Sequence, residues 1–346
     1  MKTEILTLSS PKGHEKELEH AASVLRSGGL VVFPTETVYG IGGDATNEHA
    51  AARIYEAKGR PSDNPLIIHV ADPADAEPYA VTNDTYYKLA AQFMPGPLTV
   101  ILPRRERIPL SVTGGLQTVA VRCPSHPVAN ALIRAAGVPI AAPSANLSGR
   151  PSPTLASHVI EDLSGRVEVI IDGGECEVGL ESTIIALDGD RGTLLRPGAI
   201  TYDALCCVCS EVTIAPACLE QLSADARPLS PGMKYRHYAP RASLVLLDGD
   251  VASVTSFLVS AASRQGVGIL CYDEEQALFR SAAPLFPIGH RDDLGEQAHR
   301  LFAALRAADE HADIHTLYAH LPPREGIGLA LYNRLIRAAA HTVLKV

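Results

Sequence analysis

The chain has 346 residues and a formal net charge of −9, and 46% of its residues are hydrophobic. This length suggests two domains or one large one, and the acidic balance argues against a protein that holds nucleic acid by neutralising many phosphates. No run of about 18 apolar residues predicts a membrane span, and the polar start of the sequence lacks the pattern of a secretory signal. The seven cysteines, an odd number, are therefore expected to be reduced thiols in the cytoplasm.

The first part of the chain alternates between the sequence patterns of helices and strands. Helices are expected near 15–26 and at 47–58, where Asn47 is a suitable N-cap residue. Further elements are a helix at 127–136 and strands at 30–33, 66–70, 98–102, 119–122, 139–142, 167–171, 183–187 and 193–195. The glycines of 40–45 loosely fit a dinucleotide-binding pattern, but the expected strand ends several residues earlier, so we interpret them as a turn.

The segment 211–241 differs from the sequence on either side of it. It shows little periodicity and holds four prolines, Pro216, Pro228, Pro231 and Pro240, which is typical of a linker. Its end, 230–240, is rich in Tyr, His and Arg, so we expect that part to dock on another surface. From Ser243 the alternation restarts, with strands at 244–247, 268–271, 285–288 and 316–319 and helices at 251–264, 294–308 and 327–340. This pattern predicts a parallel sheet with helices on both faces.

Five cationic residues lie at the ends of predicted strands or helices in this acidic chain: Lys58, Arg60, Arg122, Arg150 and Arg196. In the stiff loop after Lys58, arginine offers a planar fork for phosphate oxygens; alternatively, both cations cap a helix end. The polar loop 142–152 follows a predicted strand, where α/β sheets bind ligands. Alternatively, it caps the next helix through Ser152 or Thr154. Together these patterns favour an α/β protein with an anion-binding cleft, suited to a nucleoside triphosphate.

Other motifs predict no chemistry. The sequence contains no P-loop. The cluster Cys206-Cys207-Val208-Cys209 includes a C-x-x-C but no second pair, so it offers too few ligands for a closed zinc site. We interpret these cysteines as small buried hydrophobic residues at the end of a helix. His311 and His315 have the spacing of a zinc-protease helix, but Ala312 stands where that motif needs Glu, so we expect a surface loop.

Six segments in about the first 200 residues resemble, in family order, the YrdC-like family of threonylcarbamoyl-AMP synthases. They are Phe33-Pro-Thr-Glu-Thr-Val-Tyr-Gly40, Lys58-Gly-Arg-Pro-Ser-Asp-Asn-Pro-Leu66, Pro95-Gly-Pro-Leu-Thr99, Pro143-Ser-Ala-Asn-Leu-Ser-Gly149, Gly179-Leu-Glu-Ser-Thr183 and Arg196-Pro-Gly198. The segment 230–240 and the α/β pattern after it resemble the long, two-domain form, so the resemblance covers essentially the whole chain. Two small departures, Ile41 and Cys123, touch no motif residue.

The resemblance implies an N-terminal YrdC-like twisted α/β domain with a large basic cavity at 1–210 and a linker at 211–241 that docks on the active site. A smaller Rossmann-like α/β domain then follows at 242–346. The implied reaction converts L-threonine, bicarbonate and ATP, with Mg²⁺ accompanying the nucleotide, into threonylcarbamoyl-AMP and pyrophosphate. A separate tRNA-modifying complex would then use the product to modify position 37 of tRNA in the cytoplasm. This implies weak or no direct tRNA binding by this chain, no membrane, and no metal held by protein ligands.

The resemblance also implies roles for individual residues. The candidates for catalysis, which also contact ATP, are Lys58, Arg60, Ser144 and Asn146. Further ATP-binding candidates are Asn64, Thr118, Arg150, Ser152 and Arg196, with Tyr235 and Tyr238 closing over the nucleotide as a lid. Candidates for binding L-threonine are Thr35, His69, Arg122, Ala142 and Ser182. Arg122 suits the threonine carboxylate. The sequence identifies no general base.

Two other functions compete with this interpretation. Hydrogenase-maturation carbamoyltransferases contain related domains, but they add zinc-finger and acylphosphatase parts that this chain lacks. A non-catalytic RNA-binding or ribosome-maturation factor could use the same basic cavity. The net charge of −9, the absence of Trp and the six Phe residues are unfavourable for binding RNA through charge and stacking. RNA binding with a steep salt dependence and no ATP turnover would favour this alternative over the enzyme.

Overall fold

The computed structural model describes residues 1–220, 238–279 and 283–346, which fall into two compact units. Unit 1 contains the described residues of Met1–Ser148, Ser152–Glu177 and Glu181–Lys234. Unit 2 contains those of Tyr235–Val346 together with two short pieces of chain, Gly149–Pro151 and Val178–Leu180. Both units are mixtures of helices and strands, so the predicted two-domain α/β fold is confirmed.

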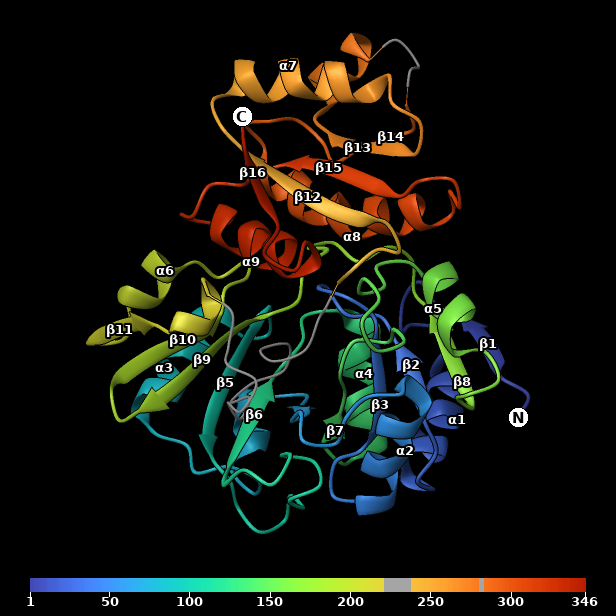
Figure 1. The fold of residues 1–346 in the computed structure, drawn as a ribbon. Coiled ribbons are helices and arrows are strands. Elements are labelled where there is room, and N and C mark those ends of the chain that lie inside the picture. Colours follow the sequence, from blue (N-terminus) through green and yellow to red (C-terminus); the bar gives the residue numbers. More distant parts are fainter. Residues whose placement is uncertain (221–237, 280–282) are drawn as a thin grey trace. The chain divides into compact units, whose positions relative to one another are not determined.

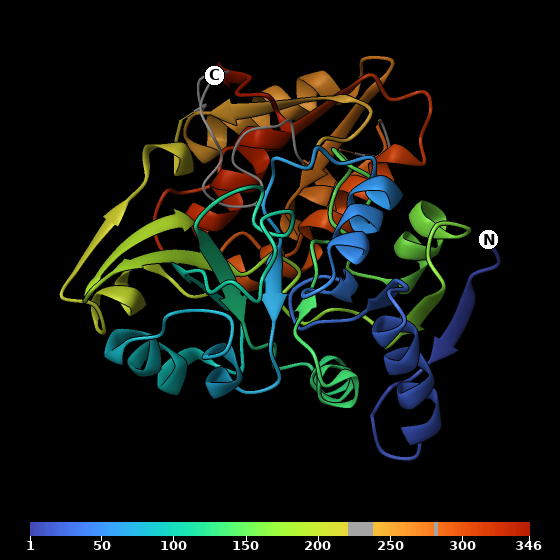
Figure 2. The same cartoon turned by 90° about the horizontal axis from the view of Figure 1, so that it is seen from below.

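Unit 1 is built on a mixed sheet whose strands lie in the order β1-β8-β2-β3-β7-β4-β6-β5-β9-β10-β11. In chain order the strands are β1 (Glu4–Thr7), β2 (Val31–Phe33), β3 (Gly40–Asp44), β4 (Ile67–His69), β5 (Leu98–Pro103), β6 (Thr118–Arg122), β7 (Ile140–Ala141), β8 (Val169–Asp172), β9 (Thr183–Asp188), β10 (Arg191–Arg196) and β11 (Glu211–Ile214). The two ends of this order, blue β1 and yellow β11, lie at opposite sides of unit 1 in both views (Figures 1 and 2).

The helices of unit 1 begin and end where their capping residues dictate. They are α1 (Glu15–Arg26), α2 (Glu48–Lys58), α3 (Asp84–Phe93), α4 (Pro127–Ala136), α5 (Ala156–Leu163) and α6 (Tyr202–Cys206), with 3₁₀ turns at Pro73–Ala76 and Pro216–Cys218. The Asn47 side chain accepts from the His49 N–H at the start of α2, as predicted. Gly59, in the left-handed region, ends the helix. This cap fixes Lys58 as the last helical residue and turns the chain toward Arg60.

The core of unit 1 forms where α1 and α4 pack on the sheet. Leu25 of α1, Leu132 of α4 and Phe33 of β2 are buried in one cluster with residues of β7 and β8. Burial of these apolar faces is the main source of stability for such a layered arrangement. The cluster includes residues of β2, β7 and β8, and the loops that follow β2 and β7 carry several of the predicted site residues, among them Thr35, Ser144 and Asn146.

Some predictions made from the sequence are wrong. The glycine-rich stretch Gly40–Asp44 is strand β3 rather than a turn. A Cβ on Gly42 would lie 2.7 Å from both Ile140 and Phe33, so the strand needs glycine in order to pack closely. Cys206 and Cys207 are exposed at the end of α6, and of this cluster only Cys209 is buried. The segment 211–241, predicted to be a linker, instead begins with strand β11, which pairs with β10 in parallel, and its residues 221–237 lie outside the described residues.

Unit 2 contains a parallel sheet in the order β14-β13-β15-β12-β16. The strands are β12 (Ser243–Asp248), β13 (Val267–Cys271), β14 (Leu285–Pro287), β15 (Thr316–His320) and β16 (Val343–Lys345). Helix α7 (Val251–Ala262) lies on one face, and α8 (Leu294–Asp309) and α9 (Gly328–Ala338) lie on the other (Figure 1). The predicted parallel sheet with helices on both faces is therefore confirmed. His311 and His315 lie in the loop between α8 and β15, as expected.

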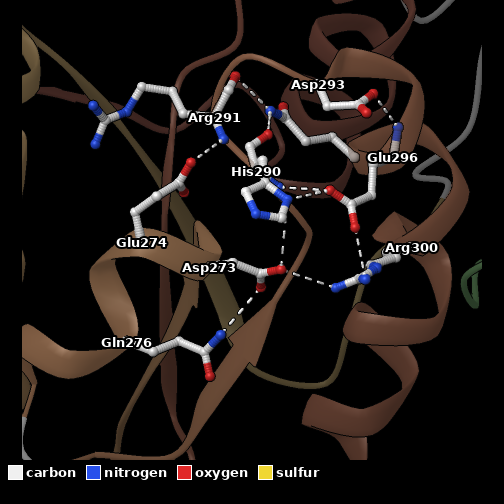
Figure 3. Close-up of polar contacts among 9 residues, drawn as sticks. Asp273, Glu274, Gln276, His290, Arg291, Asp293, Glu296 and Arg300 are labelled. Carbon is white, nitrogen blue, oxygen red and sulfur yellow. Dashed lines mark hydrogen bonds and ion pairs between the residues drawn. The ribbon is translucent and has the colours of Figure 1, made fainter.

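A charged network closes the carboxyl ends of β13 and β14 in unit 2 (Figure 3). His290 hydrogen-bonds Glu296 at 2.9 Å, and Arg300 pairs with Glu296 at 2.6 Å and with Asp273 at 3.3 Å. Asp273, His290 and Glu296 lie close enough together to bind a cation, but Arg300 already pairs with both carboxylates. We therefore interpret the network as an ordinary set of surface ion pairs.

Among the described residues, no helix is both long and apolar enough to span a bilayer.

Candidate functional site

The loop between β2 and β3, residues 34–39, is buried although it includes the polar side chains of Thr35, Glu36 and Thr37. The Thr35 hydroxyl accepts from the backbone N–H groups of Thr37 and Val38, each at 3.2 Å, and donates to the Val38 carbonyl at 2.6 Å. These bonds form a local turn that satisfies the backbone without a strand partner. The loop is therefore fixed by its own side chains, which holds Glu36 in one position.

Arg122 ends strand β6, and its side chain forms a buried ion pair with Glu36. Arg122 Nη2 lies 2.7 Å from Glu36 Oε1, and each side chain is 5% exposed. Glu36 also accepts from the backbone N–H of Ser125 at 3.2 Å. Arg122 Nε is buried and has no hydrogen-bond partner among the described residues. The guanidinium thus keeps one donor for a further acceptor, and a carboxylate is the best match for it.

His69 ends the neighbouring strand β4 and is directly beside Arg122 in the register of the sheet. Its ring is buried, meets the Phe33 ring edge-on, and hydrogen-bonds the Ile67 carbonyl through Nδ1 at 3.2 Å. Burial, followed by the nearby Arg122 charge, lowers the pKa of His69 to about 3. His69 is therefore neutral near pH 7. Because a carbonyl only accepts, Nδ1 carries the proton and Nε2 is an acceptor.

Residues on or next to the neighbouring strands β5, β9 and β10 extend this line of side chains. We call His69, Arg122, Thr99, Ser182 and Arg196 together the Arg122 row. Thr99 is the register partner of Arg122 on β5, and its hydroxyl hydrogen-bonds the Ser182 hydroxyl at 2.7 Å. Arg196, at the end of β10, donates to the Ser182 carbonyl at 2.9 Å and to its hydroxyl at 3.1 Å. Adjacent strands thus bring together three predicted residues, His69, Arg122 and Ser182, with Arg196 next to them.

A second group forms around Lys58 at the end of α2. Lys58 Nζ donates to the backbone carbonyls of Ser144 and Asn146, the latter at 2.5 Å, and lies 3.5 Å from Asn146 Oδ1. The Ser144 hydroxyl donates to the same Oδ1 at 2.5 Å. Lys58 is 3% exposed. In this structure the ammonium therefore holds the loop after β7 in shape, and its charge remains beside Ser144 and Asn146.

The loop 34–39 connects the Lys58 group with the Arg122 row. At one end Glu36 pairs with Arg122. At the other end the Tyr39 carbonyl accepts from the Ala145 N–H at 2.8 Å, and Gly40 forms a β-bridge with Ser144. A Cβ on Gly40 would lie 3.4 Å from Ala142, so the two chains approach closely. Both predicted groups of residues therefore border the same buried loop.

Arg60 and Asn64 flank the Lys58 group on the loop after α2. Arg60 donates to the Pro65 carbonyl at 3.0 Å, and its guanidinium lies 6.0 Å from the centre of the Tyr55 ring. The Tyr55 hydroxyl donates to the Asn64 carbonyl at 3.1 Å, and burial raises the pKa of Tyr55 to about 12. These contacts make the loop rigid and keep the Arg60 charge in a buried setting.

Some predicted site residues lie elsewhere. Thr118 begins β6, opposite Pro103 and at the other end of the strand from Arg122. Ser152 is buried and donates to Glu181 at 2.5 Å, and α5 is preceded by Leu155, so neither Ser152 nor Thr154 caps it. Arg150 and Tyr238 belong to unit 2. Tyr235 lies outside the described residues. Ala142 follows β7 and bonds the Ile67 carbonyl through its N–H.

Three functional candidates escaped the analysis of the sequence: Glu36, Thr99 and Glu181. Each stands inside a segment that resembles the family, but only the structure gives it a partner. Glu36 pairs with Arg122, Thr99 with Ser182, and Glu181 with Ser152. The sequence offered one signal: Glu36 and Glu181 are the only charged residues of their family-like segments, and Thr99 is the only hydroxyl residue of its segment. Within the described part of unit 1, no three His, Cys, Asp or Glu side chains lie close enough to hold a metal ion.

Comparisons with known proteins agree with the division into two units. The Sua5/YciO/YrdC family model, described as telomere recombination, matches residues 23–198, and the model of the threonylcarbamoyl-AMP synthase C-terminal domain matches residues 200–340. The threonylcarbamoyl-AMP synthase of Bacillus subtilis is 44% identical over 338 residues, covering 96% of this chain and 95% of the relative. The synthase of Pyrococcus abyssi is 43% identical over 341 residues, covering 96% of each.

A solved structure is similar over the same extent. The crystal structure of Pyrococcus abyssi Sua5 complexed with L-threonine has a TM-score of 0.91 at 42% identity, covering 99% of this chain and 100% of that chain. The similarity includes both units, and the relative's title states that it binds threonine.

Proposed function

The chain belongs to the Sua5/YciO/YrdC family of threonylcarbamoyl-AMP synthases, and we propose that it joins L-threonine, bicarbonate and ATP into threonylcarbamoyl-AMP. The observation that carries the residue assignment is the buried Arg122–Glu36 pair, whose Nε has no partner among the described residues. Leaving a buried guanidinium donor without an acceptor costs free energy. A substrate carboxylate at this position would satisfy it with a charge-assisted hydrogen bond.

The neighbours of Arg122 complete a site for an amino acid. His69 is neutral and offers an acceptor at Nε2, which suits an ammonium or hydroxyl donor of threonine. Ser182 offers a hydroxyl that Thr99 and Arg196 hold in place. The carboxylate would bind Arg122, and the polar side-chain atoms of threonine would face His69, Thr35 and Ser182. Ala142, beside the strand that carries His69, would border this site.

In the proposed reaction the amine of threonine attacks the carbon of bicarbonate and forms a carbamate with loss of water. A carbamate oxygen then attacks the α-phosphorus of ATP. The bond from the α-phosphorus to the bridging oxygen breaks, and pyrophosphate leaves with the electron pair. The protein contributes mainly by positioning the reactants and stabilising negative charge. Lys58 and Arg60 supply positive charge, and Ser144 and Asn146 supply hydrogen-bonding groups beside Lys58.

Mg²⁺ would enter with ATP, bound to the phosphate oxygens of the nucleotide. Asn64, Ser152 and Arg196 are further candidates for contacts to the nucleotide, and Arg150, Tyr238 and Tyr235 are candidates from the other chain segments. The product would pass to a separate complex that modifies position 37 of tRNA, and both steps would take place in the cytoplasm. Direct binding of tRNA by this acidic chain would be weak or absent.

Pyrophosphate release from ATP tests the proposal. We expect release that requires both threonine and bicarbonate, and we expect Arg60→Ala to abolish it because the buried cation near the phosphates is lost. Arg53→Ala is the matched control. Arg53 lies on the same helix as Lys58, α2, but its side chain pairs with Glu168 at 2.7 Å on a partly exposed surface. The control should retain activity.

If well-folded protein releases no pyrophosphate in response to threonine, the proposed reaction is wrong for this chain. The alternative of an RNA-binding factor would then predict RNA binding that weakens steeply as salt increases. Release that persists in Arg60→Ala would keep the reaction but remove Arg60 from the phosphate site.

A further inference from the structure

Unit 2 contains two short pieces of chain that are joined at both ends to unit 1 by peptide bonds: Gly149–Pro151 and Val178–Leu180. The residue that follows the first piece is Ser152, and the residues that follow the second are Glu181 and Ser182. Ser152 donates a hydrogen bond to Glu181 at 2.5 Å. Ser182 hydrogen-bonds Thr99, which is the register partner of Arg122. The position of these two pieces therefore affects the residues of the proposed site.

Helix α8 holds the first piece through Arg306. The Arg306 side chain is 3% exposed, and its Nε and Nη2 both donate to the carbonyl of Pro151, at 3.1 and 2.8 Å. The other end of the piece is also held, because the Gly149 carbonyl accepts from the Ala239 N–H at 3.0 Å. A guanidinium that directs two donors at one carbonyl fixes the direction of that peptide as well as its position.

The same helix holds the second piece by close contact of the two backbones. Gly179 has a φ of +76°, and a Cβ at this position would lie 2.4 Å from the His299 carbonyl oxygen and 2.5 Å from His299 Cα. Real Cβ atoms do not approach backbone atoms this closely, so only glycine fits. The piece 178–180 therefore lies directly against α8 without space for adjustment.

The residues involved form one stripe along α8. His299, Phe302, Arg306 and Asp309 follow one another at spacings of three and four, which places them on the same side of a helix. Phe302 stacks on Tyr238 with ring centres 5.2 Å apart, and Asp309 accepts from the Arg241 N–H at 2.6 Å. Burial raises the pKa of Asp309, and that Arg241 hydrogen bond, followed by the positive charge of Arg150, opposes the increase.

We propose that this stripe of α8 positions the ATP-binding and threonine-binding loops, with Arg306 as the positioning residue for the loop that carries Arg150 and Ser152. The inference rests on the proposed function and assigns the C-terminal unit a role within the same reaction. Arg306 acts through the Pro151 peptide and touches no substrate. Displacing Pro151 moves Ser152, and the Ser152–Glu181 hydrogen bond transmits the displacement to the second loop. The two loops therefore respond together.

The full-length chain carrying Arg306→Gln or Arg306→Lys tests the proposal, with Arg300→Gln as the matched control. Arg300 lies on the same helix but pairs with Asp273 and Glu296, away from both loops. We expect Arg306→Gln to lower kcat/KM for ATP by about tenfold to a hundredfold, because misplacement of a contact by about 1 Å has effects of this size. Arg306→Lys keeps a positively charged donor but loses the two-nitrogen fork, so it should recover part of the loss. Arg300→Gln should leave kcat/KM unchanged.

A second measurement, the increase in melting temperature caused by ATP, does not depend on turnover. We expect this increase to be smaller in Arg306→Gln than in the wild type. If the wild type shows no turnover but ATP raises its melting temperature and Arg306→Gln reduces that increase, the reaction is wrong and the positioning role stands. If Arg306→Gln is folded and both its kcat/KM and its response to ATP match the wild type, the positioning role is wrong.

If Arg306→Gln does not fold, a pair of glycine variants tests whether α8 positions the two loops. Gly179→Ala and Gly189→Ala both place a side chain at a positive φ, of 76° and 62°, but no atom lies within 4 Å of the Cβ at Gly189. The backbone strain is therefore similar, and only Gly179→Ala pushes against α8. We expect a loss of kcat/KM for both ATP and threonine in Gly179→Ala alone. Equal activity in the two variants would overturn the proposal.

Discussion

In both units an arginine, a histidine and at least one carboxylate lie near the carboxyl ends of parallel strands, but the two groups differ in burial. In unit 1, Arg122 and Glu36 are each 5% exposed, and His69 beside them is buried and neutral. In unit 2, Arg300 is 42% exposed and bridges Asp273 and Glu296, and His290 is 63% exposed (Figure 3). The same kinds of side chain thus occupy equivalent ends of the two sheets.

The difference shows why a list of residue types does not identify a site. Taking an ion pair out of water costs more than the pair alone regains, so a buried pair is a poor device for stability. The Arg122–Glu36 pair also leaves Arg122 Nε without a partner among the described residues, which gives a substrate something to bind. The unit 2 network is partly exposed to solvent, and its arginine pairs with both carboxylates. We therefore expect chemistry at the first group and small effects on stability at the second.

Among changes to these two groups, Arg122→Lys gives the largest expected effect. Lysine keeps the positive charge beside Glu36 but loses the planar fork that can hold Glu36 and a second carboxylate together. We expect kcat/KM for threonine to fall by about a hundredfold while the protein remains folded. Pyrophosphate release at varied threonine concentrations measures this, and KM for ATP should change much less.

Arg122→Gln extends the same test. It leaves the Glu36 carboxylate buried without its partner, which we expect to lower the free energy of unfolding by about 3–5 kcal/mol. The double variant Glu36→Gln/Arg122→Gln removes both charges and should recover much of this stability without recovering activity. An Arg122→Lys enzyme with unchanged KM and kcat for threonine would show that the carboxylate binds elsewhere.

The sequence predicted the layers of the fold better than it predicted the glycine-rich strand. Helix α4 was placed at its observed bounds because Pro127 and Gly137 mark its two ends. Strand β3 was missed because strand propensity disfavours glycine, whereas close packing against Ile140 and Phe33 requires it. Three-dimensional packing of this kind leaves no periodic signal in a single sequence.

Some residues of the candidate site were predictable from the resemblance, whereas the role of others is revealed only by a contact partner in the structure. Arg122 and His69 were identified by resemblance, and the register of β4 with β6 places them side by side. Glu36 was not identified, because its role depends on contact with a residue 86 positions away. The roles of Gly179 and Arg306 were also out of reach, since backbone contact and a carbonyl acceptor carry no side-chain motif.

The two histidines should respond to pH in opposite directions. The pKa of His69 is lowered by burial to about 3 in the folded protein, so its contribution favours folding above the unfolded pKa near 6.5 and is lost as the pH falls toward 3. The pKa of His290 is raised by its hydrogen bond to Glu296. Its contribution is therefore complete below about pH 6.5 and is lost as the pH rises through the folded value.

Between pH 7 and pH 5, the free energy of unfolding should fall by about 2 kcal/mol less in His69→Gln than in the wild type, because the variant has no buried imidazole to protonate on unfolding. Denaturant unfolding at the two pH values measures this difference, and His49→Gln, on the surface of α2, is the control. Other histidines, such as the half-buried His126, whose pKa is also lowered by burial, contribute equally in both proteins and cancel. A pH dependence that is the same in His69→Gln and wild type would mean that His69 is accessible to protons in the folded state.

Asp273→Asn should have the smallest effect of these changes. The Asp273 carboxylate pairs with Arg300 at 3.3 Å, but Arg300 keeps its closer bond to Glu296, and water can solvate every group involved. Exposed ion pairs contribute little, so we expect the melting temperature to change by at most about 3 °C. Pyrophosphate release should stay at the wild-type rate. A large loss of activity in folded Asp273→Asn would show that the unit 2 network takes part in the reaction. The difference in burial would then not separate the reactive group from the structural one.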